Sequence, residues 1–236
     1  MSLQSKVLTV ALIAGLAGGA GSALAVGEYD KPVTLDLAFK FHIDDDIPEQ
    51  DVFVEGADGI YRPTKGERDL SKPLYAPASP VKHAPFEPEK VGPWPKGRPL
   101  GVTLGEWLAA EGKGTYSCSD GEGHLSVAFT KLIPNGVYTF WHYFLAWPPT
   151  DPFIDSYDLP VGARDGSESV FIADADGSAV VKRTFKPCLQ LTGEHLASGL
   201  AIAWHSDGKT YGALPGEFST NSHVQLYVDL PKRSGI

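Results

Sequence analysis

The chain has few residues suited to thiolate or redox chemistry, and it lacks the common catalytic motifs. It contains 2 cysteines and 1 methionine, and that methionine is Met1. A blue-copper centre is therefore not expected, because such a site needs a free thiolate and usually an axial methionine. No G-x-S-x-G, H-E-x-x-H, phosphate-binding glycine loop or C-x-x-C motif occurs. We therefore expect a binding protein more than an enzyme.

The sequence also has fewer basic than acidic residues. The sequence has 20 lysines and arginines against 29 aspartates and glutamates, a formal net charge of -9. Nucleic acids and anionic membrane surfaces are bound through basic patches, so neither is an expected partner. After residue 25 no apolar run is long enough to span a bilayer. The partner is expected to be a small ligand, a glycan or another protein.

The first 25 residues have the pattern of a Sec-type signal peptide. Lys6 precedes the apolar run VLTVALIAGLAGGAG, and Ala23-Leu24-Ala25 supplies a small-residue cleavage site. We predict cleavage after Ala25 and a soluble mature protein that is exported, either to a periplasm or to the extracellular space. The alternative is a retained membrane anchor, which the short Gly- and Ala-rich run would make poorly.

The cysteine pair fits an oxidising compartment. Cys118 and Cys188 are the only two cysteines, and an exported chain with one pair is expected to join them. Such a bond closes a long loop, which stabilises the fold by roughly 4 kcal/mol on the chain-entropy model. The alternative is a metal-thiolate role for the two sulfurs.

Composition and periodicity predict an all-β fold. The 26 glycines, 19 prolines and many aromatic residues are typical of strands joined by turns. Apolar residues alternate with a period of two in several segments, which is typical of half-buried strands. We expect an antiparallel β-sandwich of the Greek-key, Ig-like or jelly-roll type. The strands expected in the sandwich are 115–119, 124–132, 137–147, 170–173, 179–185, 199–205 and 224–230, and a further strand is expected at 32–43 in the N-terminal part.

The chain is expected to divide into consecutive parts. Residues 26–70 form an N-terminal β arm or small module, and residues 71–100, with eight prolines, form an extended linker. Residues 101–231 form the sandwich, and 232–236 are a tail. A short helix is predicted from Thr103 to Ala110, because Thr103 and Glu106 have the spacing of a capping box.

Turn signals predict three hairpins within the sandwich. Pro134-Asn135-Gly136 separates two strongly β-prone runs, which favours a hairpin from Leu125 to Trp147. Ala175-Asp176-Gly177-Ser178 does the same for residues 170–185. The last two strands are expected to pair across the loop from Ser206 to Ser222.

Histidines at the ends of those last strands are the main candidate site. Apolar residues occupy the even positions of both strands, so His205 and His223 are predicted to point outward. Antiparallel pairing would place their side chains roughly 5–7 Å apart. With Asp207, and with His142 from a neighbouring strand, they could bind copper or zinc. The alternative is two polar strand-end side chains without a metal.

Aromatic side chains suggest a second function class. Trp141, Tyr143 and Trp147 share one face of the strand 137–147, and Tyr138, Phe140 and Phe144 share the other with His142. One face must belong to the core, and the other is either covered or a platform for a carbohydrate or protein partner. The alternative function is therefore a carbohydrate-binding or adhesion module without a metal.

His205-Ser206-Asp207 holds the residue types of a hydrolytic triad. Consecutive strand positions point to opposite faces, so these three residues cannot form the relay.

Two sequence blocks resemble a group of uncharacterised exported bacterial proteins. The blocks are LIPNGVYTFW, residues 132–141, and HSDGKTYG, residues 205–212, with Pro215-Gly216 following. The resemblance covers about Leu104 to Pro231 and implies one domain over that span, with a role for the loop after His205. It implies no activity and no catalytic residue.

Overall fold

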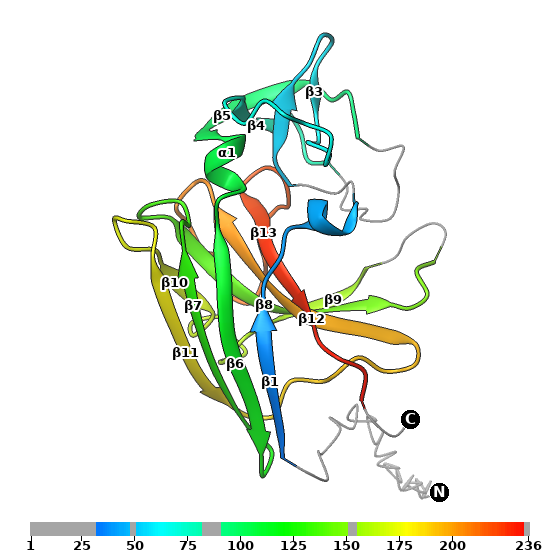
Figure 1. Ribbon diagram of the computed structural model, residues 1–236, viewed down its shortest axis with the longest axis vertical. Coiled ribbons are helices and arrows are strands. Elements are labelled where there is room, and N and C mark those ends of the chain that lie inside the picture. Colours follow the sequence, from blue (N-terminus) through cyan, green and yellow to red (C-terminus); the bar gives the residue numbers. More distant parts are fainter. Residues whose placement is uncertain (1–31, 48–50, 82–90, 151–154, 234–236) are drawn as a thin grey trace, which may run out of the picture.

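The protein is an antiparallel β-sandwich with a small third sheet over one end (Figure 1). The computed structural model describes residues 32–47, 51–81, 91–150 and 155–233. The predicted all-β sandwich with a short helix is confirmed. Residues 1–25, the predicted signal peptide, lie outside the described residues. Among the residues that are described, no helix is long and apolar enough to cross a membrane.

The two sheets of the sandwich contain most of the strands. The first sheet has the order β1-β6-β7-β11. Its strands are β1 (Val33–Ala38), β6 (Glu111–Ser119), β7 (Glu122–Thr130) and β11 (Ala179–Phe185). The second has the order β10-β8-β12-β13, with β9 also paired to β8. Its strands are β8 (Val137–Ala146), β9 (Asp155–Pro160), β10 (Val170–Ile172), β12 (Leu196–His205) and β13 (Ser222–Asp229).

The core lies between these sheets and follows the predicted alternation. Leu125, Val127 and Phe129 of β7 are buried, whereas the residues between them are half-buried or exposed. From the facing sheet, Phe140 of β8 meets Phe129 with ring centroids 6.1 Å apart. Aromatic pairs at this separation add to the stabilisation from burial alone.

Two of the three predicted hairpins are instead arches between the sheets. The turn at Asn135 forms, with φ of 55° and Gly136 N donating to the Ile133 carbonyl at 2.9 Å. Its flanking strands β7 and β8 nevertheless belong to different sheets, and so do β10 and β11. The prediction was wrong because turn chemistry reverses the chain without deciding whether the strands pair edge to edge. Here each strand buries its apolar face against the other sheet.

The third hairpin, β12 with β13, is confirmed, but a β-bulge changes its register. Ile202 is opposite Leu226, whereas Ala203 is opposite Val224, so Gln225 is the extra residue. A bulge of this kind shifts the alternation by one position. The residues of β13 that precede it therefore face the opposite way from the simple even-odd pattern.

Both ends of the proline-rich stretch belong to strands of a sheet, contrary to the extended linker expected from the sequence, and residues 82–90 lie outside the described residues. The third sheet has the order β3-β2-β4-β5. Its strands are β2 (Phe53–Glu55), β3 (Ile60–Tyr61), β4 (Pro73–Pro77) and β5 (Lys96–Thr103). The pairing of β4 with β5 is irregular on both sides of Tyr75, which accommodates prolines that cannot donate a backbone hydrogen bond. β1, expected in a separate arm, pairs with β6 in the sandwich.

The first strand is shorter than its alternation predicts. β1 ends at Ala38, and the 3-10 helix η1 (His42–Asp45) follows it.

The predicted helix forms at the expected N-cap but is shorter than the predicted span 103–110, and the predicted disulfide is confirmed. α1 (Leu104–Trp107) lies between the sandwich and the third sheet (Figure 1). Thr103 Oγ1 accepts from Glu106 N at 3.3 Å, while Glu106 Oε2 accepts from Thr103 N at 2.7 Å, which completes the capping box. Cys118 of β6 is bonded to Cys188, with Cα atoms 5.9 Å apart. The bond fastens the segment after β11 to the first sheet.

Candidate functional site

Both predicted metal-binding histidines are buried; His223 faces the core, contrary to the sequence prediction, whereas His205 lies on the predicted outer face but is covered. His205 and His223 are 1% and 0% exposed. Trp204, on the core side of β12, is opposite His223, and their rings are 5.5 Å apart. The bulge at Gln225 therefore turns His223 inward, and this is the physical reason for the error.

His205 faces the opposite side of the sheet from His223. It follows Trp204 directly along the strand, so its side chain points the other way. Its Nε2 is 2.8 Å from Thr139 Oγ1, and its ring is 5.8 Å from that of Tyr211. The two imidazoles are adjacent in the register but do not converge on one point.

The other predicted ligands do not complete a site with them. Asp207 Oδ2 accepts a hydrogen bond from the Tyr211 hydroxyl at 2.5 Å. His142 pairs with Leu200, five residues before His205 on β12, so it lies roughly 16 Å along the strand. Among the described residues no group of three or more histidine, cysteine, aspartate or glutamate side chains could hold a metal ion. Copper or zinc binding stays a prediction without a geometric basis.

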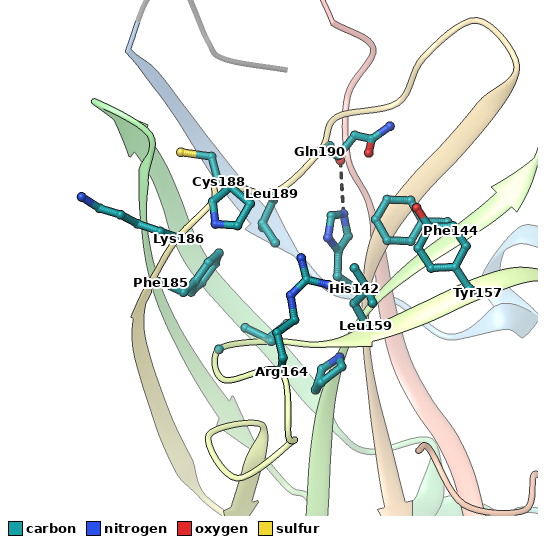
Figure 2. Close-up of a pocket in the computed structure, with 14 residues that line it drawn as sticks. His142, Phe144, Tyr157, Leu159, Arg164, Phe185, Lys186, Cys188, Leu189 and Gln190 are labelled. Carbon is teal, nitrogen blue, oxygen red and sulfur yellow. Dashed lines mark hydrogen bonds between the residues drawn. The ribbon is translucent and has the colours of Figure 1, made fainter. Parts of the chain in front are cut away.

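One member of the predicted set, His142, borders a cavity of about 310 Å³. The cavity lies between β8 and β9 on one side and the segment after β11 on the other. Figure 2 shows His142 near its centre, with Arg164 extending toward the ring. The lining residues are His142, Phe144, Tyr157, Leu159, Pro160, Val161, Gly162, Arg164, Phe185, Lys186, Pro187, Cys188, Leu189 and Gln190.

His142 is held as a neutral imidazole with one nitrogen available. Burial lowers its pKa to about 4, with Arg164 adding to the effect and a hydrogen bond to the Gln190 carbonyl opposing it. Because Nε2 is 3.2 Å from that carbonyl oxygen, it must donate its proton there. Nδ1 is then an acceptor, and within the described part of the chain it has no hydrogen-bond partner.

The cavity has a positively charged rim. Arg164 is exposed, and among residues 32–47, 51–81, 91–150 and 155–233 no carboxylate forms an ion pair with it. Lys186 lies on the other side of the cavity, with Nζ 3.5 Å from Glu122 Oε2. An unpaired guanidinium with a flat fork of donors is well suited to a carboxylate or phosphate.

Part of the remaining wall is aromatic. The rings of His142 and Phe144 are 4.2 Å apart, and Tyr157 of β9 stacks on Phe144 at 4.6 Å. Tyr157 is 40% exposed, so one part of its ring is open to solvent. The cavity lining therefore includes aromatic side chains, a hydrogen-bond acceptor and a cation.

The aromatic faces of β8 are covered in most places. Tyr138 and Phe140 lie in the core, and Trp141, on the other face, is only 3% exposed. Tyr143 is half-buried and donates to Asp229 Oδ1 at 2.5 Å, whereas Trp147 is 42% exposed. Trp141 is therefore covered and is no binding platform, whereas Trp147 is the more exposed tryptophan of this face.

Sequence reasoning found His142 but missed Arg164 and Gln190. Both lie in irregular segments, where neither periodicity nor a motif marks a residue. Arg164 was recognisable only as a cation in a loop rich in aspartate, proline and glycine.

Comparison with known proteins adds no relative. No protein-family model matches the chain, and no curated protein is significantly similar to it.

Proposed function

We propose that the protein is an exported binding protein that holds a small organic anion in the cavity beside His142. The observation that carries this proposal is that two complementary groups line one cavity. The Arg164 guanidinium has no ion-pair partner in the described chain, and the neutral His142 has its Nδ1 available as an acceptor. A cavity of about 310 Å³ is at the lower end of the range typical of small-molecule sites.

The chemistry of the wall defines the ligand class. Arg164 favours a carboxylate or phosphate, and His142 Nδ1 favours a hydroxyl or N–H donor. The apolar and aromatic side chains of the lining, Tyr157 among them, favour a ligand with an aromatic body. A small aromatic acid that carries a hydroxyl group combines all three features.

Export is supported by two independent features. The first 25 residues have the pattern of a signal peptide, and the Cys118–Cys188 disulfide is stable in an oxidising compartment. A periplasmic or extracellular location would give the cavity direct access to solutes outside the cytoplasm.

The test is calorimetric titration of the untagged chain 26–236 with 4-hydroxybenzoate. The uncharged analogue 4-hydroxybenzamide tests the contribution of the Arg164 cation. Benzoate, which lacks the hydroxyl group, tests the contribution of the His142 Nδ1 acceptor. We expect 4-hydroxybenzoate to bind most tightly, and Arg164→Gln to weaken it about tenfold, as for loss of a charge-assisted hydrogen bond. Arg68→Gln changes an exposed arginine in the loop between β3 and β4; it is the control and should bind as wild type. Absence of binding by all three compounds, or equal affinities for wild type and Arg164→Gln, would refute the proposal.

A neutral sugar is the second candidate, because Tyr157 lines the cavity and is 40% exposed. Sugar rings stack on aromatic faces without needing a cation. Binding of an oligosaccharide that survives Arg164→Gln but is lost in Tyr157→Ala would favour this function over the first.

A further inference from the structure

Ser206 and His223 form a hydrogen-bonded pair at the end of the β12–β13 hairpin. Ser206 Oγ is 2.7 Å from His223 Nε2, and Ser206 directly follows the last residue of β12. This pair is distinct from the His142 cavity, because the register places His142 against Leu200, near the middle of the same strand. The inference below does not depend on the proposed ligand.

The other ring nitrogen of His223 determines the direction of that hydrogen bond. Nδ1 is 2.6 Å from the carbonyl oxygen of Asp51, which can only accept, so Nδ1 carries the proton. In a neutral imidazole Nε2 is then an acceptor, and the Ser206 hydroxyl donates to it. Burial lowers the pKa of His223 to about 4, although the hydrogen bond to Asp51 acts to raise it. The ring is therefore neutral near pH 7.

Arg98 supplies a positive charge at the serine oxygen. Its Nη2 donates to Ser206 Oγ at 2.6 Å and to the Thr220 carbonyl at 2.9 Å. Ser206 is half-buried and Arg98 is exposed, so a substrate can approach from the solvent side. A guanidinium at this position can also contact an oxygen on which negative charge develops.

We propose that Ser206 is a nucleophile toward small carboxylic esters, with His223 as its general base. The Asp51 carbonyl orients the imidazole, and Arg98 stabilises the oxyanion. The arrangement has the relations of a serine hydrolase site: a nucleophile bonded to a base, and a base bonded to an orienting acceptor. The sequence motif His205-Ser206-Asp207 is not this relay, because the base comes from β13 instead.

The reaction conserves atoms and charge. Ser206 Oγ forms a bond to the acyl carbon while its proton moves to His223 Nε2. The bond between the acyl carbon and the ester oxygen breaks, and the leaving alcohol takes that proton. Water then attacks the acyl-serine with the same base, which releases the carboxylic acid and restores the serine.

The test is labelling of the intact chain 26–236 with a fluorophosphonate probe, followed by mass spectrometry of the modified peptide. We expect the probe to modify Ser206, and p-nitrophenyl acetate to be hydrolysed by wild type but not by Ser206→Ala. His223→Asn keeps a donor toward the Asp51 carbonyl but lacks Nε2, and its labelling rate should fall on the order of 100-fold. Ser178→Ala is the control, because Ser178 is half-buried and its hydroxyl contacts Asp174 instead of a histidine.

Folding of each variant is checked by its melting temperature. Should His223→Asn fail to fold, the exposed Arg98→Gln takes its place, with an expected loss of about tenfold in labelling rate, as for one charge-assisted hydrogen bond. Folded wild type without label on Ser206, or a folded Arg98→Gln or His223→Asn variant that reacts as fast as wild type, would overturn the proposal.

Discussion

His142 and His223 are both buried imidazoles with a pKa lowered to about 4, yet their surroundings differ. His142 borders a cavity and has one nitrogen without a partner in the described chain. His223 has both nitrogens bonded, to Ser206 and to Asp51. Burial explains why both pKa values are low. The two sites differ because one ring nitrogen of His142 is available to a ligand, whereas the corresponding position of His223 is bonded to Ser206. A low histidine pKa alone therefore does not distinguish a ligand site from a serine-bonded base.

The largest expected effect is acid sensitivity, which both histidines should share. In the folded protein their pKa is about 4, below the value near 6.5 in the unfolded chain. Between pH 4 and 6.5 the unfolded state therefore binds more protons than the folded state. Stability should therefore decrease as the pH falls from about 6.5 toward 4, by about 3 kcal/mol for each imidazole. Burial also lowers the pKa of His205, which acts in the same direction. Urea denaturation at pH 7, 5.5 and 4 measures this loss.

The matched variants His142→Asn and His223→Asn separate the two contributions. Each should remove part of the slope between pH 6.5 and 4. A slope that neither substitution changes would show that other groups control the acid sensitivity.

Removal of the disulfide should affect the two sites unequally. Cys118→Ala with Cys188→Ala releases a cross-link between residues 70 apart, which costs about 4 kcal/mol of unfolding free energy. Cys188 lines the His142 cavity, so ligand affinity should fall as well. Labelling of Ser206 should persist, because the disulfide does not contact that pair. Denaturation and probe labelling of the double variant measure both effects, and equal loss at both sites would contradict the separation.

Truncation of the two histidines to alanine should reduce the free energy of unfolding by different amounts, because their packing differs. His223→Ala removes two hydrogen bonds from a fully buried position and leaves a void, so we expect a loss of about 3 kcal/mol. His142→Ala only enlarges an existing cavity and removes one hydrogen bond, so about 1 kcal/mol is expected. Chemical denaturation at pH 7.5, where both rings are neutral, compares them. A larger loss for His142→Ala would reverse the assignment.

The smallest expected effect on stability is that of Arg164→Gln. Arg164 is exposed and has no ion-pair partner in the part of the chain that is described, so the ligand-free variant should stay within about 0.5 kcal/mol of wild type. Its ligand affinity should nevertheless fall, as proposed above. Denaturation with and without 4-hydroxybenzoate tests this difference, and a large loss without ligand would indicate a structural role instead.

Local patterns in the sequence were sufficient for the fold class and several details. The alternation in β7, the capping box of Thr103 with Glu106 and the Cys118–Cys188 bond are all confirmed. Each depends on neighbouring residues or on a single available pair, so no long-range information is needed.

The proline-rich segment shows where local patterns fail. Proline density predicts an extended linker, but β4 pairs with β5 in the third sheet. Pairing between distant strands can tolerate prolines at edges and irregular positions, and the sequence does not state which strands will meet.

Local residue patterns were enough to predict most strands of the sandwich, the helix cap and the disulfide. The direction of the His223 side chain and the hydrogen-bond partners of both His205 and His223 depend on contacts in the folded chain. One extra residue at Gln225 turns His223 inward. The loop after β9 places Arg164 in the same cavity as His142, and strand β5 of the third sheet brings Arg98 to Ser206. The physical reason is that a side chain's face depends on register, and register depends on contacts between strands far apart in the sequence.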